Sequence, residues 1–505
     1  MSATRRIFFL ALAGVTLIKL TLAAWLPLTG DEAYFFIWGK YPGLGYYDHP
    51  PMVGWWLHAV QLLGSAEWWL RLPAYLMTTF IAWAIYRWLR DGWGEERAVL
   101  AGLLYLLAPL NVINVLISTD TPLILFSFLS ALALKRALEA EGYRWFVFSG
   151  LLLGLAFLAK YFAVLLGLSY GVYLLVINRS RRNAHGLLLL FVAVLPFAAL
   201  NLWWNYCHCW DNVLFNFYNR HSGGGGSWMN PMLYFAMLAY VVTPPLLWYG
   251  WRRRTELRAV FGRGEPFLWL WLLPMAVFAL LSFGARIGLH WVLAFYPFLF
   301  LLAALVLDLQ QLRRSVRFMA WFSLAHVGLL ACTLALPLDI WKSQPSFYQD
   351  MVRARYSSEY WAQMQPHLGG YALATGSYVQ SAILEHRSGR RVHVFGDASR
   401  YGRQDDLLSD FRTLNGGAIA IFLPVGKAST YAAYFEQYDV QTITVHGITD
   451  HLLLGRGFRY EKYRDEVLRL VRDQYYRLPW FLPAGACYFY DKYFPDEEVK
   501  RLPRR

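Results

Sequence analysis

Two neighbouring carboxylates near the end of a long hydrophobic stretch are the first candidates for chemistry. Asp31 and Glu32 follow the apolar stretch 7–28, and a charged pair beside a bilayer is costly unless it has a use. A second acid, Asp120, lies in Ser118-Thr119-Asp120-Thr121-Pro122 at the start of another such stretch. A carboxylate in this position can act as a general base toward a hydroxyl group or take part in metal-assisted chemistry.

Cationic and imidazole side chains lie near the ends of other hydrophobic stretches. They are Lys160, Arg220, Arg286, His290 and, in front of a Pro-Pro pair, His49. Because such cations stabilise the charge that develops on a phosphate, acids and cations on one membrane face predict phosphate-leaving-group chemistry. If Arg286 and His290 are on one helix, their spacing of four residues gives them a common face. The alternatives are that the cations only reach the headgroups and that Asp120 only caps a helix.

The elements that must position these side chains are membrane-spanning helices. The chain has 505 residues, of which 57% are hydrophobic and only 16% are charged, against about a quarter in soluble domains. About eleven stretches are apolar over the length that a helix needs to cross a bilayer. They lie near 7–28, 72–89, 98–117, 120–134, 145–160, 161–177, 186–204, 231–250, 266–283, 287–307 and 318–337. The sequence therefore predicts a polytopic α-helical membrane protein.

Basic residues are divided unequally between the loops that join these stretches. Eleven spans put nineteen Lys and Arg residues in one set of loops and five in the short loops of the opposite set. By the positive-inside rule, this asymmetry places the N-terminus in the cytoplasm. An odd number of spans then places Asp31 and the C-terminal third outside. The net charge of +14 therefore reflects mainly topology and does not predict a nucleic-acid partner.

Composition changes after Pro337 and predicts a second domain. We expect 1–337 to form the transmembrane domain, with outer loops at 29–71 and 205–230, and 338–505 to form a soluble outer α/β domain with a largely parallel sheet. Its predicted strands are 371–375, 391–395, 418–422 and 440–445, and its predicted helices are 377–388, 404–414, 428–438 and 461–477. The loop 205–230 contains four consecutive glycines and either orders over a substrate or is a plain connector.

The cysteines predict neither a disulfide framework nor a metal site. There are four of them, at positions 207, 209, 332 and 487, which is too few and too scattered for a disulfide framework. Cys207-His208-Cys209 contains ligand types that bind zinc, but ordinary packing at the end of a span is the better interpretation.

Several motifs in combination resemble the bacterial GT-C glycosyltransferases. They are Leu28–Tyr34, Tyr47–Pro51, Ser118–Pro122, Leu158–Tyr161 and the His290-Trp291 segment. Within that class they are similar to the branch that contains the dolichyl-phosphate-mannose protein mannosyltransferases and the lipid A aminoarabinose transferase. Ser399-Arg400-Tyr401-Gly402 is also similar to bacterial members, so the resemblance covers nearly the whole chain.

The resemblance implies an inner-membrane enzyme of GT-C type whose active site and C-terminal α/β domain face the periplasm. Such an enzyme takes a sugar from a polyprenyl phosphate donor, such as undecaprenyl phosphate, and transfers it with inversion to a lipid, glycan or protein, as in lipopolysaccharide modification. Asp31 would be the catalytic carboxylate, with Glu32 and Asp120 as acceptor-positioning or metal-associated acids. Lys160, Arg220, Arg286, His290 and His49 would bind the donor phosphate, and Tyr34, Tyr47 and Asp48 would contact the acceptor or the sugar.

One position departs from the family pattern. The aminoarabinose branch has a lysine before its Pro-Pro pair, placed to meet the donor phosphate, and this chain has His49. Either His49 takes that role or Lys160, Arg220 or Arg286 does, and the departure argues against aminoarabinose as the sugar. The sequence identifies no certain cofactor, and a divalent metal could take part, with Glu32, Asp120 and His49 as candidate ligands.

A transporter or flippase for a lipid-linked sugar is the alternative from another class of protein. Such a protein would share the many spans and the outer cations, but it should keep ionisable groups near the bilayer midplane, in broken helices. Here the acids stand at the ends of the spans and a soluble domain follows, which favours an enzyme.

Overall fold

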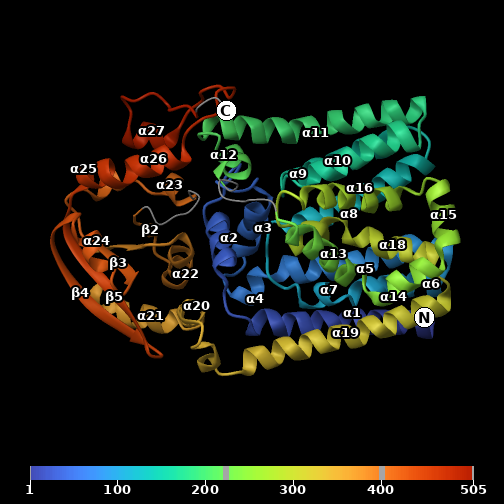
Figure 1. Cartoon of the computed structure of the whole chain (residues 1–505), viewed down its shortest axis with the longest axis horizontal. Helices are drawn as coiled ribbons and strands as arrows, with labels where there is room; N and C mark the ends of the chain where they lie inside the picture. The colour runs from blue at the N-terminus through green and yellow to red at the C-terminus, as the bar shows by residue number, and fades with distance from the viewer. Residues whose placement is uncertain (1, 220–226, 397–403, 503–505) are drawn as a thin grey trace. The chain divides into compact units, whose positions relative to one another are not determined.

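The computed structural model describes residues 2–219, 227–396 and 404–502 (Figure 1). The chain forms two compact units, each built from several stretches of sequence. The helical unit contains Met1–Leu26, Gly64–Ala199 and Gly224–Ala335. The mixed unit contains Pro27–Leu63, Leu200–Gly223 and Leu336–Arg505. The first outer loop, with Asp31, therefore belongs to the same unit as the C-terminal third of the chain.

The helical unit is built from long apolar helices and shorter helices between them. The long ones are α1 (Ala3–Trp25), α5 (Leu72–Trp93), α8 (Asp120–Glu139), α11 (Arg181–Cys207), whose end enters the mixed unit, and α19 (Leu309–Ala335). The shorter ones are α4 (Glu67–Leu70), α6 (Glu95–Leu106), α7 (Pro109–Ile113), α9 (Arg144–Phe157), α10 (Ala163–Val172), α13 (Met229–Val242), α14 (Pro244–Arg252), α15 (Arg254–Gly262), α16 (Pro266–Leu281), α17 (Leu289–Val292) and α18 (Tyr296–Val306). Each of the eleven predicted stretches contains helix, although 98–117 is divided between α6 and α7 and 231–250 between α13 and α14, and this confirms a polytopic helical membrane protein.

The number of spans stays a prediction. Among the described helices, five are long and apolar enough to cross a membrane, or up to seven if each of two bent pairs is one span. One pair bends by 84° between α13 and α14, at Thr243, which has a positive φ of 73° and precedes Pro244-Pro245. The other bends by 100° between α15 and α16. Prolines at these breaks end a helix because they lack the N–H that continues it.

Close packing holds the helices of this unit together. A side chain at Gly150 in α9 would meet the Leu190 carbonyl oxygen of α11 at 2.2 Å, so glycine permits this approach. Ser130 of α8 lies 2.9 Å from the Tyr170 hydroxyl of α10 and donates to the Ser149 carbonyl at 2.8 Å. Small residues and buried hydroxyls are the usual means by which helices associate where water is absent.

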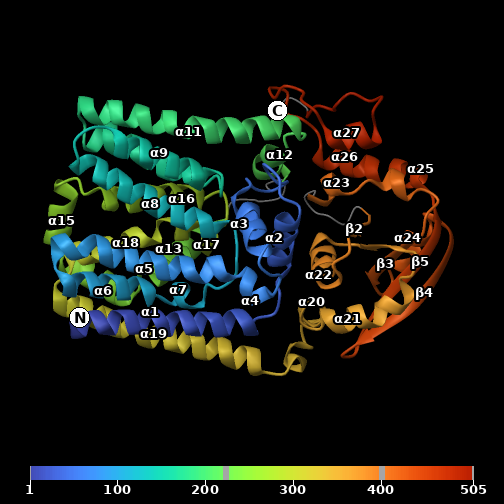
Figure 2. The same ribbon diagram turned by 180° about the vertical axis from the view of Figure 1, so that it is seen from behind.

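The mixed unit is a five-stranded sheet with helices on both faces (Figure 2). The strand order is β2 (Val392–Val394), β1 (Ala372–Thr375), β3 (Ile419–Pro424), β5 (Ile448–Phe458) and β4 (Phe435–Val445). Its helices are α2 (Gly30–Lys40), α3 (Met52–Gln61), α12 (Asp211–Phe217), α20 (Pro345–Arg355), α21 (Ser357–Met364), α22 (Tyr378–Ser388), α23 (Gln404–Leu408), α24 (Ala428–Ala432), α25 (Tyr460–Tyr463), α26 (Arg469–Tyr475) and α27 (Tyr488–Tyr493). Alternate residues of β3 enter separate cores on the two faces, because side chains along a strand alternate in direction.

The structure contains the predicted strands and helices of an α/β domain, but the sheet is mixed and not largely parallel. The strands predicted at 371–375, 391–395 and 418–422 are β1, β2 and β3, and they are parallel. The prediction of a largely parallel sheet is wrong, because β5 runs antiparallel to β3 and β4. The predicted helix 428–438 ends at Ala432 and gives way to β4. The signal that was missed is His446-Gly447, whose positive φ values of 48° and 77° suit a two-residue hairpin turn.

The first outer loop packs tightly inside the mixed unit. Helix α2 lies against α3 and against α22 of the C-terminal region. The Lys40 ammonium donates to the Glu385 carboxylate at 3.0 Å. A side chain at Gly30 would lie 2.3 Å from Cγ1 of Val379, so only glycine fits the start of α2. The loop is thus a folded part of this unit.

Candidate functional site

The motif Thr29-Gly30-Asp31-Glu32 starts helix α2 through a capping box. The Thr29 hydroxyl accepts from the Glu32 backbone N–H at 3.4 Å, and a Glu32 carboxylate oxygen accepts from the Thr29 N–H at 3.4 Å. Glu32 is only 1% exposed. The positive N-terminal end of the helix dipole also stabilises this negative charge. Glu32 therefore has a structural reason to be acidic. Its predicted role in positioning an acceptor stays a prediction.

Asp31 differs from its neighbour because its carboxylate is not used by the fold. The side chain is exposed, and within the described ranges nothing donates a hydrogen bond to it. Although the side chain is exposed, the protein around it partly desolvates the carboxylate, and this desolvation and, second, the Glu32 carboxylate raise the pKa of Asp31 above its ordinary value. A free carboxylate of raised pKa is a stronger proton acceptor than an ordinary aspartate, which suits a general base.

A cavity of about 410 Å³ in the mixed unit begins one residue before Asp31. One wall is Leu28, Thr29 and Gly30, and the opposite wall comes from α20, α21 and α22. Polar groups from Asp350, Arg353, Ser357, Ser377 and Gln380 line it beside apolar ones from Phe347, Met351 and Phe422. The volume and the mixture of aromatic, hydroxyl, amide and charged groups are those of a small-molecule site.

The tyrosines predicted to contact the acceptor or sugar lie in a buried network that holds the first outer loop. The Tyr34 hydroxyl donates to Asp48 at 2.9 Å and accepts from the Gln404 backbone N–H at 2.9 Å. The Gln404 side chain accepts from the Tyr47 backbone N–H at 2.8 Å. The Tyr47 hydroxyl accepts from Asn219 at 3.2 Å. The network gives Tyr34, Tyr47 and Asp48 structural contacts, and their predicted substrate contacts stay untested.

The backbone around His49 is held by the amide side chain of Asn212 in α12. Asn212 is fully buried and donates to the carbonyls of Tyr46, Tyr47 and His49, the last two at 3.3 Å. The His49 ring lies 6.1 Å from the Trp38 ring and is half-buried. Sequence reasoning missed Asn212, because no local pattern links an asparagine to a loop more than 160 residues earlier.

In the helical unit, Asp120 and Lys160 form a buried ion pair. The Lys160 ammonium donates to both Asp120 oxygens, at 2.8 and 2.9 Å, and both side chains are only 10% exposed. Asp120 is the first residue of α8, and its backbone N–H donates to the Ser118 hydroxyl at 3.3 Å. The residue at the N-cap position of α8 is Thr119, whose side chain makes no capping hydrogen bond, and the Asp120 carboxylate binds Lys160 and does not cap the helix.

The His290-Trp291 segment lies close to this ion pair. The Lys160 ammonium is 5.2 Å from the centre of the Phe162 ring, and that ring is 4.8 Å from the Trp291 ring. His290 and Arg286 are both exposed. Arg286 precedes α17 and is not helical, so the predicted common helix face with His290 is wrong. The structure therefore brings Asp120, Lys160 and the His290 segment together within one unit.

Some predicted residues cannot be placed in this way. Arg220, the glycines 223–226 and the motif 399–402 lie outside the described residues. Among the residues that the structure does describe, no group of three His, Cys, Asp or Glu side chains could hold a metal ion. Glu32 is engaged by Thr29 and Asp120 by Lys160, so these candidates do not form a ligand set, and no step below is routed through a metal.

A disulfide corrects the prediction that the four cysteines provide no disulfide framework. Cys209 and Cys487, 278 residues apart, are joined in the mixed unit and are both buried. Next to them, the Tyr488 hydroxyl donates to Asp211 at 2.8 Å, and burial raises the pKa of that carboxyl well above its ordinary value. A single distant cysteine pair has no spacing pattern, so sequence reasoning could not find it.

Comparisons with known proteins agree with this architecture. A family model described as dolichyl-phosphate-mannose-protein mannosyltransferase matches residues 48–204. The lipid A galacturonosyltransferase RgtD of Rhizobium johnstonii is 29% identical over 282 residues, which are 53% of this chain and 58% of that protein. The crystal structure of ArnT from Cupriavidus metallidurans in the apo state matches with a TM-score of 0.63 at 15% identity, covering 90% of this chain and 98% of that one. The resemblance to the GT-C glycosyltransferases is confirmed.

The match to the mannosyltransferase family model includes only part of the candidate residues. Residues 48–204 contain Asp48, His49, Asp120 and Lys160. Asp31 precedes the matched segment. The likeness to the ArnT structure concerns the fold, and it covers most of both chains. The comparisons therefore support the fold, and the role of Asp31 is argued from its own geometry.

Proposed function

We propose that the protein is an inner-membrane glycosyltransferase that moves a sugar from a polyprenyl phosphate, such as undecaprenyl phosphate, to an acceptor on the periplasmic face. The observation that carries the proposal is Asp31. Its carboxylate is free of hydrogen bonds among the described residues and has a raised pKa, and the preceding residue, Gly30, lines a cavity of about 410 Å³. The neighbouring Glu32 already caps helix α2, so a structural role at this helix start does not explain why residue 31 is also acidic.

The reaction that these groups support is a direct displacement at the sugar. An acceptor hydroxyl attacks the anomeric carbon while Asp31 takes its proton, and the bond to the polyprenyl phosphate breaks with its electrons leaving on the phosphate. Because attack and departure occur on opposite sides, the configuration inverts without a covalent enzyme intermediate. The acceptor glycan is proposed to occupy the cavity beside Thr29 and Gly30, where aromatic and hydroxyl groups suit a sugar.

The buried Lys160 is the proposed contact for the donor phosphate. An ammonium group has three N–H donors, and Asp120 accepts from it with both of its oxygens. The remaining donor and the positive charge suit a phosphate group. Asp120 then positions the ammonium, and His290 and Arg286, both exposed, are proposed as further phosphate contacts.

Two observations support placing the acidic loop outside the cytoplasm. Basic residues are concentrated in the loops that the positive-inside rule assigns to the cytoplasm. The mixed unit also contains the Cys209–Cys487 disulfide, and disulfides form and persist mainly in oxidising compartments such as the periplasm. The lipid A acceptor in the name of the Rhizobium relative suggests a lipid A glycan as the first acceptor to test.

One observation favours a lipid-linked-sugar transporter, the alternative function. Lys19 lies inside α1, is fully buried, and its ammonium has no hydrogen-bond partner among the described residues. Ionisable groups within spans often mark transport pathways. However, a transporter offers no use for the free Asp31 carboxylate at the start of α2.

Proteoliposomes containing the full chain separate the two functions. A polyprenyl phosphate carrying a radiolabelled sugar is incorporated with lipid A, and the product is separated from the donor by chromatography. The proposal expects label in the lipid A fraction and free polyprenyl phosphate in the donor fraction. Movement of intact donor between leaflets with no transfer to any lipid, glycan or protein would overturn it in favour of the transporter.

A further inference from the structure

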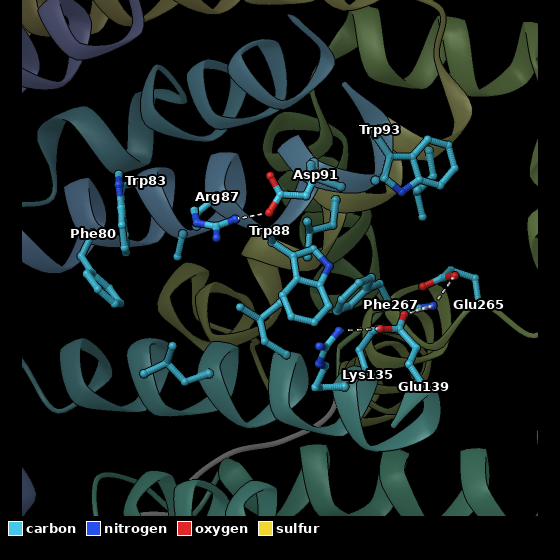
Figure 3. Close-up of a pocket in the computed structure, with 18 residues that line it drawn as sticks. Phe80, Trp83, Arg87, Trp88, Asp91, Trp93, Lys135, Glu139, Glu265 and Phe267 are labelled. Atoms are coloured by element: carbon cyan, nitrogen blue, oxygen red, sulfur yellow. Dashed lines mark hydrogen bonds and ion pairs between the residues drawn. The ribbon is translucent and has the colours of Figure 1, made fainter. Parts of the chain in front are cut away.

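A larger cavity, of about 860 Å³, lies in the helical unit and has no part in the proposed transfer (Figure 3). It is bounded by the C-terminal ends of α5, α8 and α18 and by the start of α16. One part of its lining is apolar, from Phe80, Trp83, Leu129, Leu132, Leu301 and Leu305. The other part is charged, from Arg87, Asp91, Lys135, Arg136, Glu139 and Glu265. The cavity is therefore a groove with an apolar length and a polar end.

The spacing of residues along α5 explains this division. Phe80, Trp83, Arg87 and Asp91 are three or four residues apart and share one face of the helix. From Phe80 to Asp91 the helix rises by about 16 Å, close to half of a hydrocarbon core of about 30 Å. Phe80 and Trp83 are 41% and 40% exposed, as expected of side chains that face lipid. The groove thus has the length of one leaflet.

The polar end holds equal numbers of positive and negative groups. Arg87 pairs with Asp91 at 2.5 Å, and Lys135 contacts Glu265 at 3.2 Å and Glu139 at 3.8 Å. Figure 3 shows the Trp88 ring between the Arg87–Asp91 pair and the group around Lys135. With three bases and three acids in the lining, this end of the groove does not favour a ligand that carries a net charge. It matches a headgroup that carries one charge of each sign.

One carboxylate oxygen in this lining lacks a donor. Oε1 of Glu265 is buried and has no hydrogen-bond partner in the described part of the chain, while its other oxygen accepts from Lys135 at 3.2 Å. A buried acceptor without a donor costs free energy, so a ligand with an N–H group at this point would be stabilised. A primary ammonium supplies such a donor, whereas a quaternary ammonium has no N–H.

We propose that the groove binds one phospholipid with an aminoethyl phosphate headgroup. Its ammonium donates to Glu265 and the neighbouring carboxylates, its phosphate accepts from Arg87 and Lys135, and its acyl chains lie along Phe80, Trp83 and the leucines. By the positive-inside rule this end of the helices is cytoplasmic, so the lipid comes from the inner leaflet. The site is independent of sugar transfer.

Native mass spectrometry of the delipidated full chain in detergent tests this assignment. Phosphatidylethanolamine, phosphatidylglycerol and phosphatidylcholine with identical acyl chains are each titrated, and bound lipid is counted. Phosphatidylethanolamine should bind at least about tenfold more tightly than the other two, because one charge-assisted hydrogen bond is worth about that factor. Equal or tighter binding of phosphatidylglycerol would overturn the proposal in favour of a general anionic-lipid surface.

Two variants locate the site, and two controls match them. Glu265→Gln should weaken phosphatidylethanolamine binding about tenfold and leave phosphatidylglycerol binding unchanged, while Trp83→Ala should weaken all three lipids. Glu141→Gln and Arg181→Gln change exposed residues outside the groove and should change nothing. Unaltered lipid preference in Glu265→Gln, in protein with an unchanged Tm, would refute the site.

Discussion

The Asp120–Lys160 pair gives a prediction whose size follows from the structure. At 2.8 Å and an effective dielectric constant of about 20, the attraction is roughly 6 kcal/mol before desolvation is subtracted. Because both side chains are only 10% exposed, loss of either partner leaves a buried charge unpaired. Lys160→Met and Asp120→Asn should therefore each lower the free energy of unfolding by about 3–5 kcal/mol. Lys160→Met combined with Asp120→Asn should cost less than the sum of the single effects.

Unfolding in mixed micelles, followed by circular dichroism, measures this double-mutant cycle. The expected coupling energy is about 2–3 kcal/mol, near the upper end for contacting pairs. Ser118→Ala is the matched control at the same helix start and should cost only about 1 kcal/mol, since it removes one hydrogen bond to the Asp120 N–H and no charge. If the two single variants add without coupling, the buried ion pair is not the basis of stability at this site.

Three further perturbations test other parts of the account. Since Asp31 has a raised pKa and must be ionised to take a proton, transfer activity should fall as pH drops through that pKa. The contribution of protonated Asp31 to the free energy of unfolding should be lost as pH rises through the same pKa. A pH–rate profile unchanged in Asp31→Glu would contradict this. Asn212→Ala should lower the free energy of unfolding by about 2–3 kcal/mol, because three backbone carbonyls lose a donor. A loss below about 0.5 kcal/mol would contradict the role of Asn212 in holding the loop around His49. Gly30→Ala should lower Tm through contact with Val379, and Val379→Ala should restore it; failure of that rescue would count against the packing of α2 on α22.

Hydrophobicity predicted the helical unit well because the length and apolar composition that a membrane helix needs are properties of the stretch itself. All eleven predicted stretches contain helix, and the strands β1 to β3 lie where short apolar runs predicted them. Breaks within helices were harder to predict. The bend at Thr243 depends on a positive φ and on neighbouring packing, which hydropathy does not report.

Contacts between distant segments account for what the sequence did not reveal. The Cys209–Cys487 disulfide, the Asn212 amide and the Tyr34–Gln404 hydrogen bond each join residues at least 160 positions apart. They make the first outer loop and the C-terminal region one compact unit, although the chain order separates them by most of the membrane helices. Asp31 could be selected from the sequence, but only the capping box shows that Glu32 serves the fold.

The most direct test of the central claim is sugar transfer by Asp31→Asn. The purified full chain is supplied with a labelled polyprenyl phosphate sugar and a lipid A acceptor, and initial rates are compared at one protein concentration. Loss of the general base should reduce the rate by about 10²–10⁴-fold while Tm stays unchanged. Asp496→Asn, an exposed aspartate of the same unit with no hydrogen-bond partner among the described residues, should transfer at the normal rate. Turnover by Asp31→Asn within about threefold of the unaltered protein would contradict the account, since a general base contributes far more than that.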